Sequence, residues 1–144
     1  MSSEPSGSIV FDTGVLVELA VDSTIANDTR NRILGGEIRP VTGELNVVEL
    51  SYLLCRKAGR ENANRSVTYL RKTGQFRILP SSSFLDLAAR MKCERSISLV
   101  DCVTICIGES LEIPVLFANR EREIQLEMRK RPFKTRFFFL NGRA

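Results

Sequence analysis

Residues 8–20 read SIVFDTGVLVELA, and this stretch decides the fold. A short apolar, β-branched segment runs directly into Asp12, and an apolar segment with helical spacing follows over residues 13–20. The pattern predicts a buried strand that ends at Asp12 and a helix that begins after it. A buried carboxylate is costly unless a partner compensates it. Asp12 is therefore either the N-cap of the helix or part of a site at the end of the strand.

Strands and helices alternate along the rest of the chain. Further strands are predicted at residues 37–43, 75–80, 113–119 and 135–140, and helices at residues 23–36, 44–59, 60–74, 81–95, 98–112 and 120–130. Strands that are separated by helices need crossover connections, which produce a mostly parallel sheet with helices on both faces. The sequence therefore predicts one α/β domain over residues 8–140, preceded by a flexible leader at residues 1–7.

Two of the predicted helices open with the spacing of a capping box. Ser83 is followed three residues later by Asp86, and Ser98 is followed three residues later by Asp101. In such a box the serine side chain accepts a hydrogen bond from the backbone N–H three residues on. Both serines are therefore predicted to cap a helix.

The composition excludes several classes of enzyme and of location. None of the 144 residues is a histidine, which rules out Ser-His-Asp catalysis, Cys-His catalysis and zinc sites with histidine ligands. No apolar stretch approaches the roughly 18 residues of a membrane-spanning helix, and the polar start lacks a signal peptide. We expect a cytoplasmic protein with no membrane partner. The net charge of +4 suits a nucleic-acid partner, although solvated helix faces explain the basic clusters equally well.

The four cysteines do not have the spacing of a metal site. Cys55, Cys93, Cys102 and Cys106 include no CxxC pair, and without histidine a zinc site would need all four thiolates. We interpret them as small buried hydrophobic residues. A disulfide that involves Cys55 or Cys93 remains an alternative.

Polar residues follow several of the predicted strands. Asp12 follows the first strand, Thr42 and Glu44 the second, and Asn119 the fourth. In open parallel sheets, ligands bind at the carboxyl ends of the strands where the strand order reverses. These side chains are therefore candidates for a shared site, although Glu44 is also a good first-turn residue for a helix.

Two further acids lie among apolar residues of predicted helices. Glu49 lies within NVVELSYLL and Asp101 within SLVDCVTI, and both are expected to be buried. Structural roles remain open for each, because Asp101 can complete the capping box of Ser98 and Glu49 can lie on a solvated face. The other common acid and phosphate motifs of α/β proteins, including the P-loop and GxGxxG, are absent.

Taken together, these stretches resemble the PIN domain, the fold of the VapC-type toxin ribonucleases. The resemblance is carried by VFDTGVLVELA (10–20), VTGELNVVELSYLL (41–54) and ISLVDCVTICIGESLEIPVLFANREREI (97–124), and it extends over residues 8–140. It implies a three-layer α/β fold with a parallel sheet of about five strands in the order 3-2-1-4-5.

The resemblance also implies a site. Asp12, Glu49 and Asp101 would be the catalytic acids and the ligands of Mg²⁺ or Mn²⁺, with Thr13 in support. Gathered carboxylates repel one another, and a divalent cation reverses the sign of that interaction. The chain departs from the family where an Asp usually follows the fourth strand, because Asn119 stands there and brings no charge.

The implied activity is metal-dependent hydrolysis of single-stranded RNA by the toxin of a toxin–antitoxin pair. Arg120, Arg122 and Lys72 are the candidates for binding RNA, with Arg71 and Arg95 as weaker ones.

The family resemblance also implies partners. PIN toxins commonly form homodimers, and they are silenced by a small antitoxin protein laid in a groove beside the acids. Tyr52, Leu53 and Tyr69 are candidate interface residues. The alternative function is a PIN-like domain with weakened catalysis that binds RNA or protein, or an RNA-processing factor.

Overall fold

The computed structural model describes residues 5–140 of the chain and contains a five-stranded parallel sheet in the order β3-β2-β1-β4-β5. The strands are β1 (Gly7–Phe11), β2 (Ile38–Gly43), β3 (Arg77–Leu79), β4 (Val115–Phe117) and β5 (Phe137–Phe139). β1 is the central strand and pairs with β2 along one side and with β4 along the other. The predicted fold class and strand order are confirmed, and the order reverses between β1 and β4.

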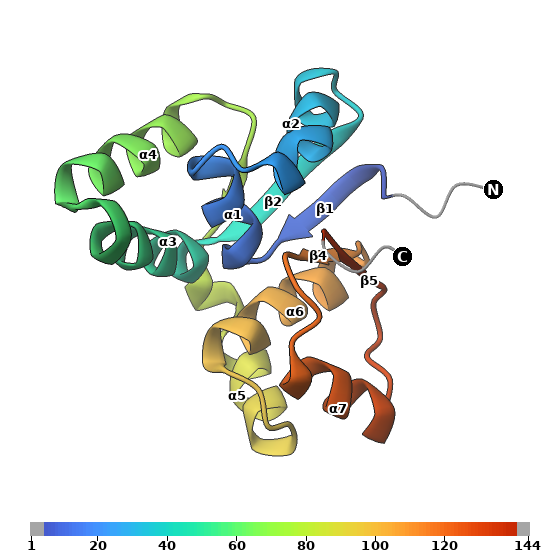
Figure 1. Ribbon diagram of the computed structural model, residues 1–144. Coiled ribbons are helices and arrows are strands. Elements are labelled where there is room, and N and C mark those ends of the chain that lie inside the picture. The colour runs from blue at the N-terminus through green and yellow to red at the C-terminus, as the bar shows by residue number, and fades with distance from the viewer. Residues whose placement is uncertain (1–4, 141–144) are drawn as a thin grey trace.

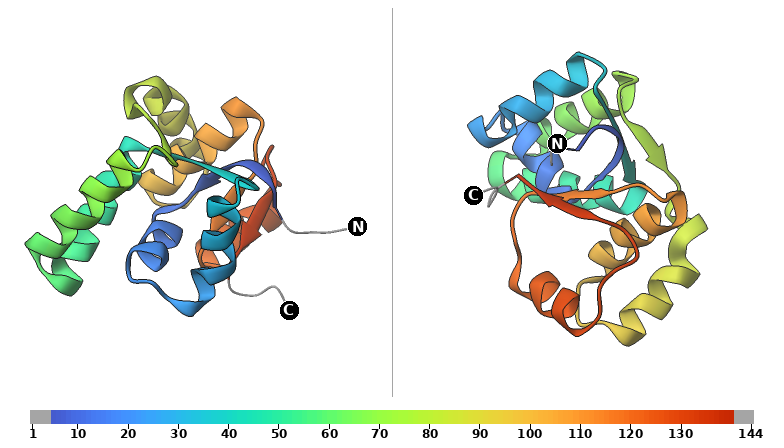
Figure 2. Two further views of the ribbon diagram at one scale, coloured as in Figure 1. Left: turned by 90° about the horizontal axis from the view of Figure 1, so that it is seen from above. Right: turned by 90° about the vertical axis from the view of Figure 1, so that its right-hand side faces the viewer.

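Helices cover both faces of the sheet. They are α1 (Thr13–Ala20), α2 (Asn27–Leu34), α3 (Glu44–Ala58), α4 (Arg60–Lys72), α5 (Leu85–Glu94), α6 (Leu99–Leu111) and α7 (Arg122–Lys130). Figure 1 shows α1 to α4 above the sheet and α5 to α7 below it, and Figure 2 shows the same three layers from two other directions.

Two apolar cores hold the layers together, one on each face of the sheet. Side chains of β1 alternate between them: Ile9 and Phe11 pack against α1 to α4, whereas Val10 packs against α5 to α7. All three side chains are fully buried. A strand that is buried on both faces is expected to be apolar throughout, as this one is until Asp12.

The two predicted capping boxes have different outcomes. Ser98 is the N-cap of α6, and its Oγ accepts a hydrogen bond from the N–H of Asp101 at 3.1 Å, as predicted. The prediction for Ser83 is wrong, because Ser83 lies inside a 3₁₀ turn, Ser81–Phe84, and Phe84 precedes α5. That turn is held from outside, since the Oγ of Ser81 accepts a hydrogen bond from the N–H of Leu45 at 2.9 Å.

The cysteines are all free thiols, as their spacing suggested. Cys102 and Cys106 are buried in α6, and burial raises the pKa of their thiols to about 11 and about 12. Cys93 is exposed at the end of α5 and Cys55 is half-buried in α3, so the prediction of buried residues is wrong for these two.

β1 begins at Gly7, the last residue of the predicted leader, and residues 1–4 of that leader lie outside the described residues. Within the described part, no helix combines the length and the apolar character needed to cross a membrane.

Candidate functional site

Asp12 lies at the point where β1, β4 and α1 meet. Its N–H donates a hydrogen bond to the carbonyl of Leu116 in β4 at 3.0 Å, so the chain is still held against the sheet at this residue. Asp12 is also the N-cap of α1, and its Oδ2 accepts a long hydrogen bond of 3.4 Å from the N–H of Gly14. A Cβ atom at position 14 would lie 3.0 Å from the Cβ of Ala118, so the first turn of α1 is pressed against the end of β4. The buried carboxylate is thus held at the reversal of strand order.

Asp101 faces the same region from the first turn of α6. Burial and the charge of Asp101 raise the pKa of Asp12 to about 8. Burial and the charge of Glu121 raise the pKa of Asp101 to about 6. Both carboxyl groups therefore resist ionisation, chiefly because they are buried and also because neighbouring carboxylates repel a negative charge on them.

Glu49 approaches this pair from α3. It is half-buried, its Oε2 accepts a hydrogen bond from the hydroxyl of Tyr52 at 3.3 Å, and its charge acts on Asp101 and Glu121. The prediction that Glu49 and Asp101 are buried is wrong, since both are half-buried. Val48 beside Glu49 is exposed, so this part of α3 turns toward solvent and not into the core.

Glu121 is an acid of the region that the sequence did not single out. It lies in the loop between β4 and α7, immediately before α7, and its side chain makes no capping hydrogen bond with that helix. Together with Asp101 and Glu123 it lines a cleft of about 490 Å³. Burial and the charges of Glu123 and Glu49 raise the pKa of Glu121. Its position two residues after Asn119 is the only sequence signal that points to it.

Comparison with known proteins identifies the family of the chain and agrees with its fold. The sequence profile of the PIN domain matches residues 9–124, which include β1, the acids and the loop after β4. The chain belongs to the PIN domain family. PIN domains are nucleases, and they generally use divalent metal ions. No curated protein matches the chain in sequence.

Several solved structures share the fold of this PIN domain. VapC20 of Mycobacterium tuberculosis, a toxin that cleaves the sarcin–ricin loop, is 18% identical with a TM-score of 0.61, covering 74% of this chain and 86% of that one. VapBC2 of Rickettsia felis, bound to a promoter DNA fragment, is 10% identical with a TM-score of 0.64, covering 92% and 98%. FitAcB of Neisseria gonorrhoeae is 14% identical with a TM-score of 0.60, covering 90% and 96%.

The donor chemistry of the site fits a hard divalent cation. Mg²⁺ is commonly held by one or two carboxylates, with waters and substrate phosphates as the other ligands. Asp12 and Asp101 supply such a pair, and each carries a raised pKa that a cation would relieve. Among residues 5–140, no three acids lie close enough to form a ready-made cage for an ion. A third carboxylate would therefore act through water or after a side-chain movement.

The two supporting residues predicted for the site of this PIN domain lie in different surroundings. Thr13 is buried, and its Oγ1 accepts a hydrogen bond from the side-chain amide of Asn46 at 3.1 Å. Asn119 is exposed in the loop after β4, two residues before Glu121, and it does not line the cleft that Glu121 lines.

The predicted RNA-binding residues of this PIN domain are exposed, but they occupy two separate places. Arg120 and Arg122 lie in the loop after β4 and at the start of α7, and Lys72 is the last residue of α4. The guanidinium of Arg120 also lies 4.5 Å from the ring centre of Phe139.

The two weaker candidates are engaged in structural contacts. Arg71 forms a bidentate pair with Glu44 at 2.8 and 2.9 Å. Arg95 is buried and donates hydrogen bonds to the carbonyls of Glu127, Arg131 and Pro132, so it is a structural residue.

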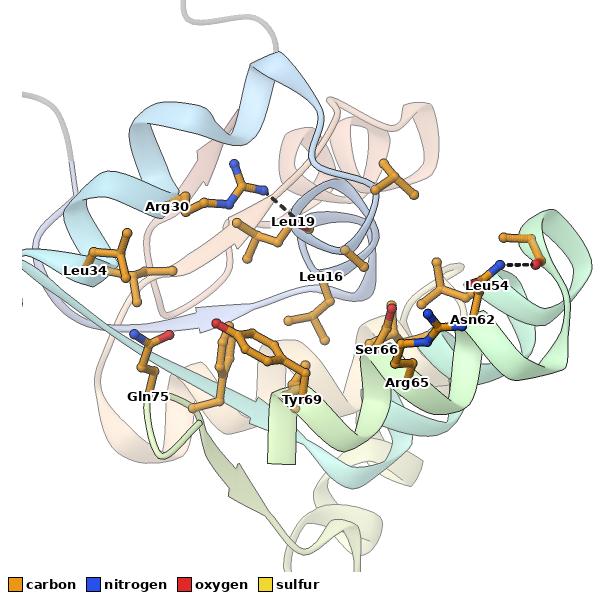
Figure 3. Close-up of a pocket in the computed structure, with 17 residues that line it drawn as sticks. Leu16, Leu19, Arg30, Leu34, Leu54, Asn62, Arg65, Ser66, Tyr69 and Gln75 are labelled. Carbon is orange, nitrogen blue, oxygen red and sulfur yellow. Dashed lines mark hydrogen bonds between the residues drawn. The ribbon is translucent and has the colours of Figure 1, made fainter. Parts of the chain in front are cut away.

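An apolar groove of about 640 Å³ lies on the opposite face of this PIN domain, between α1, α2, α3 and α4. Figure 3 shows Leu16 and Leu19 at its floor, with Leu34 on one wall and Tyr69 on the other. Leu34 is 64% exposed and Tyr69 is 67% exposed, which is unusual for large apolar side chains on facing helices. Asp12, Glu49 and Asp101 do not line this groove.

Proposed function

We propose that the protein is a metal-dependent ribonuclease that hydrolyses phosphodiester bonds in single-stranded RNA, as the toxin of a toxin–antitoxin pair. The observation that carries the proposal is the meeting of Asp12 and Asp101 at the reversal of strand order in a PIN domain. A fold gains no stability from placing two carboxylates together in a partly buried position. The arrangement is useful to a protein that binds a cation there.

Asp12 and Asp101 are the residues that would hold Mg²⁺ or Mn²⁺, with Glu49 and Glu121 in reach through water. When bound, the cation supplies charge neutralisation at the phosphate and a lower pKa for the attacking water. The proton of that water needs an acceptor, and the chain has no histidine. Glu121 is a candidate for this role because it lines the same cleft as Asp101, and because burial and neighbouring carboxylates raise its pKa above that of an ordinary glutamate. Glu121 thereby takes the place of the acid that Asn119 lacks.

The exposed arginines beside the cleft would bind the RNA backbone. Arg120 and Arg122 flank Glu121 in sequence and carry positive charge to the edge of an acidic site. Phosphate contacts of this kind position the strand without reading its sequence. Lys72, at the end of α4, would make a separate contact with the backbone.

We place the antitoxin in the apolar groove, although the family resemblance implied a groove beside the acids and Asp12, Glu49 and Asp101 do not line this one. The solved structure from Klebsiella pneumoniae with a TM-score of 0.57 is a toxin–antitoxin complex, as are the paired proteins from Rickettsia felis. The groove in this chain is mostly apolar and open, which suits the apolar stripe of an amphipathic segment.

A cleavage assay tests the proposal. Purified protein should cut single-stranded RNA when Mn²⁺ or Mg²⁺ is added, stop cutting in excess EDTA, and resume when metal is restored. RNA that is bound but never cut under any of these conditions would instead support the alternative, a PIN-like binding module.

A further inference from the structure

Asn46 is a fully buried amide at the centre of a hydrogen-bonded network behind the acids. Its Nδ2 donates to the Oγ1 of Thr13 at 3.1 Å and to the Oγ1 of Thr104 at 2.9 Å. Its Oδ1 accepts a hydrogen bond from the N–H of Gly43 at 3.2 Å. The side chain of one residue therefore ties together the first turns of α1 and α3 and the middle of α6.

Each helix that this network joins carries one of the proposed acids within a turn of the contact. Thr13 directly follows Asp12 in α1. Thr104 lies one turn after Asp101 in α6, and Asn46 itself lies one turn before Glu49 in α3. A shift of any of the three helices relative to the others would change the separation of the acids.

The hydrogen-bonded network around Asn46 is also tightly packed. A Cβ atom at position 43 would lie 3.0 Å from the Cδ1 of Ile107 and 3.1 Å from the Oδ1 of Asn46, so a larger residue there would press on both side chains. The hydroxyl of Thr104 in turn donates to the carbonyl of Val100 at 2.8 Å, within the first turns of α6. Fully satisfied buried networks of this kind favour a single arrangement of the elements they join.

The chemistry of the amide explains why Asn stands at this position. An amide offers an acceptor and two donors from one planar group, whereas Asp offers only acceptors and Leu offers neither. Apolar residues of similar size would pack between the helices but would leave the buried N–H of Gly43 without its acceptor.

We propose that Asn46 is a positioning residue that sets the separation of Asp12, Glu49 and Asp101 through Thr13 and Thr104. The inference rests on the proposed function in that these acids form the metal site. Asn46 contacts none of the three carboxylates in this network, so it acts on the site through the helices that carry them.

The first test measures the affinity for Mn²⁺ by calorimetry in variants of the network. Thr104→Val keeps the volume of the side chain but removes the hydroxyl that accepts the hydrogen bond from Asn46. We expect the affinity for Mn²⁺ to fall about tenfold, which is at the low end of the losses seen when a residue that orients metal ligands is changed. Thr104→Ser restores the hydroxyl and should restore affinity. Thr135→Val is the matched control, because the hydroxyl of Thr135 bonds the carbonyl of Ile113 at the amino end of β4. Parent-like affinity in Thr104→Val would overturn the inference.

The second test needs no metal, so it separates this inference from the proposed function. At pH 9 Asp101→Asn removes the charge repulsion with Asp12, so this variant should melt at a higher temperature than the parent. In a Thr104→Val background the helices can move apart, so the rise in melting temperature that Asp101→Asn causes should shrink to about half, because the two sites are coupled. Asn46→Leu serves as a second background if that variant folds. Equal gains in both backgrounds would show that the network does not set the separation. A parent that binds no Mn²⁺ would contradict the proposed function while this cycle still reports on Asn46.

Discussion

Asp12 has to satisfy two roles with one carboxylate, since it caps α1 and also faces Asp101. Its cap hydrogen bond is long at 3.4 Å, and burial together with Asp101 raises its pKa to about 8. Substitution of an ordinary N-cap usually destabilises a protein. Here the repulsion and the burial oppose the capping, so the net effect of neutralising Asp12 has the opposite sign at high pH.

The folded protein holds the proton of Asp12 more tightly than the unfolded chain does. Between about pH 4 and pH 8 the folded state therefore binds more protons, and the metal-free protein should lose stability as the pH rises through this window. Asp12→Asn removes that loss and should stabilise the metal-free protein at pH 8.5 by roughly 1–3 kcal/mol, with little change near pH 4. Urea unfolding at both pH values measures it. A variant that is less stable than the parent at pH 8.5 would show that the ionised Asp12 does not destabilise the metal-free protein.

Glu121 should contribute to metal binding without being essential to the fold. Glu121→Gln keeps the shape of the side chain and removes the charge that acts on Asp12 and Asp101. We expect the affinity for Mn²⁺ to fall about tenfold, as is typical when a residue that interacts with the metal ligands is changed. Asp86→Asn, an exposed acid in the first turn of α5, is the control. Equal affinities in the two variants would exclude Glu121 from the site.

The sequence pointed to some residues of the site and not to others for a physical reason. Asp12 and Asp101 interrupt apolar stretches, so the sequence pattern itself shows carboxylates where burial is energetically unfavourable. Glu121 lies in a charged segment, where one more acid carries no signal. Asn46 looks like an ordinary polar residue in the first turn of a helix, and only the packing of α1 and α6 around it reveals its contacts.

At the scale of elements, the order and the type of nearly all strands and helices followed from periodicity. The ends of elements were less predictable because they depend on contacts from elsewhere in the chain. The segment that contains Ser83 illustrates this, since Leu45 of α3 bonds the neighbouring Ser81 and the segment forms a 3₁₀ turn in place of the predicted cap. The apolar groove has the same origin, because four helices that each look amphipathic in sequence leave a gap where they meet.

The groove leads to a prediction about partners. An antitoxin protein that docks in the groove should be captured at least tenfold less by Leu34→Glu, because the change places an unpaired charge in an apolar contact and burying such a charge is costly. Leu126→Glu is the control, since Leu126 is also partly exposed but belongs to α7 on the other face. Pull-down of the co-expressed partner by each variant measures it, and equal capture by both would place the partner elsewhere.

For the molecule as a whole, the exposed apolar side chains predict self-association. Tyr52 and Leu53 of α3 and Tyr69 of α4 keep 43%, 36% and 67% of their surface exposed, so these candidate interface residues are accessible to a second chain. A twofold dimer is the commonest way to cover such a surface. Light scattering over a wide range of concentrations should give twice the chain mass of 16.2 kDa at the upper end. A mass of one chain throughout would contradict the dimer.

The acids at the reversal of strand order are proposed to carry out the cleavage of RNA. The rate of cleavage of a single-stranded RNA in Mn²⁺ should fall at least 100-fold in Asp12→Asn, because loss of a group that acts only in the transition state lowers the rate steeply. Asp86→Asn should cleave at the parent rate, and unfolding curves should show that both variants are folded. A folded Asp12→Asn variant that cleaves RNA as fast as the parent would contradict the central claim.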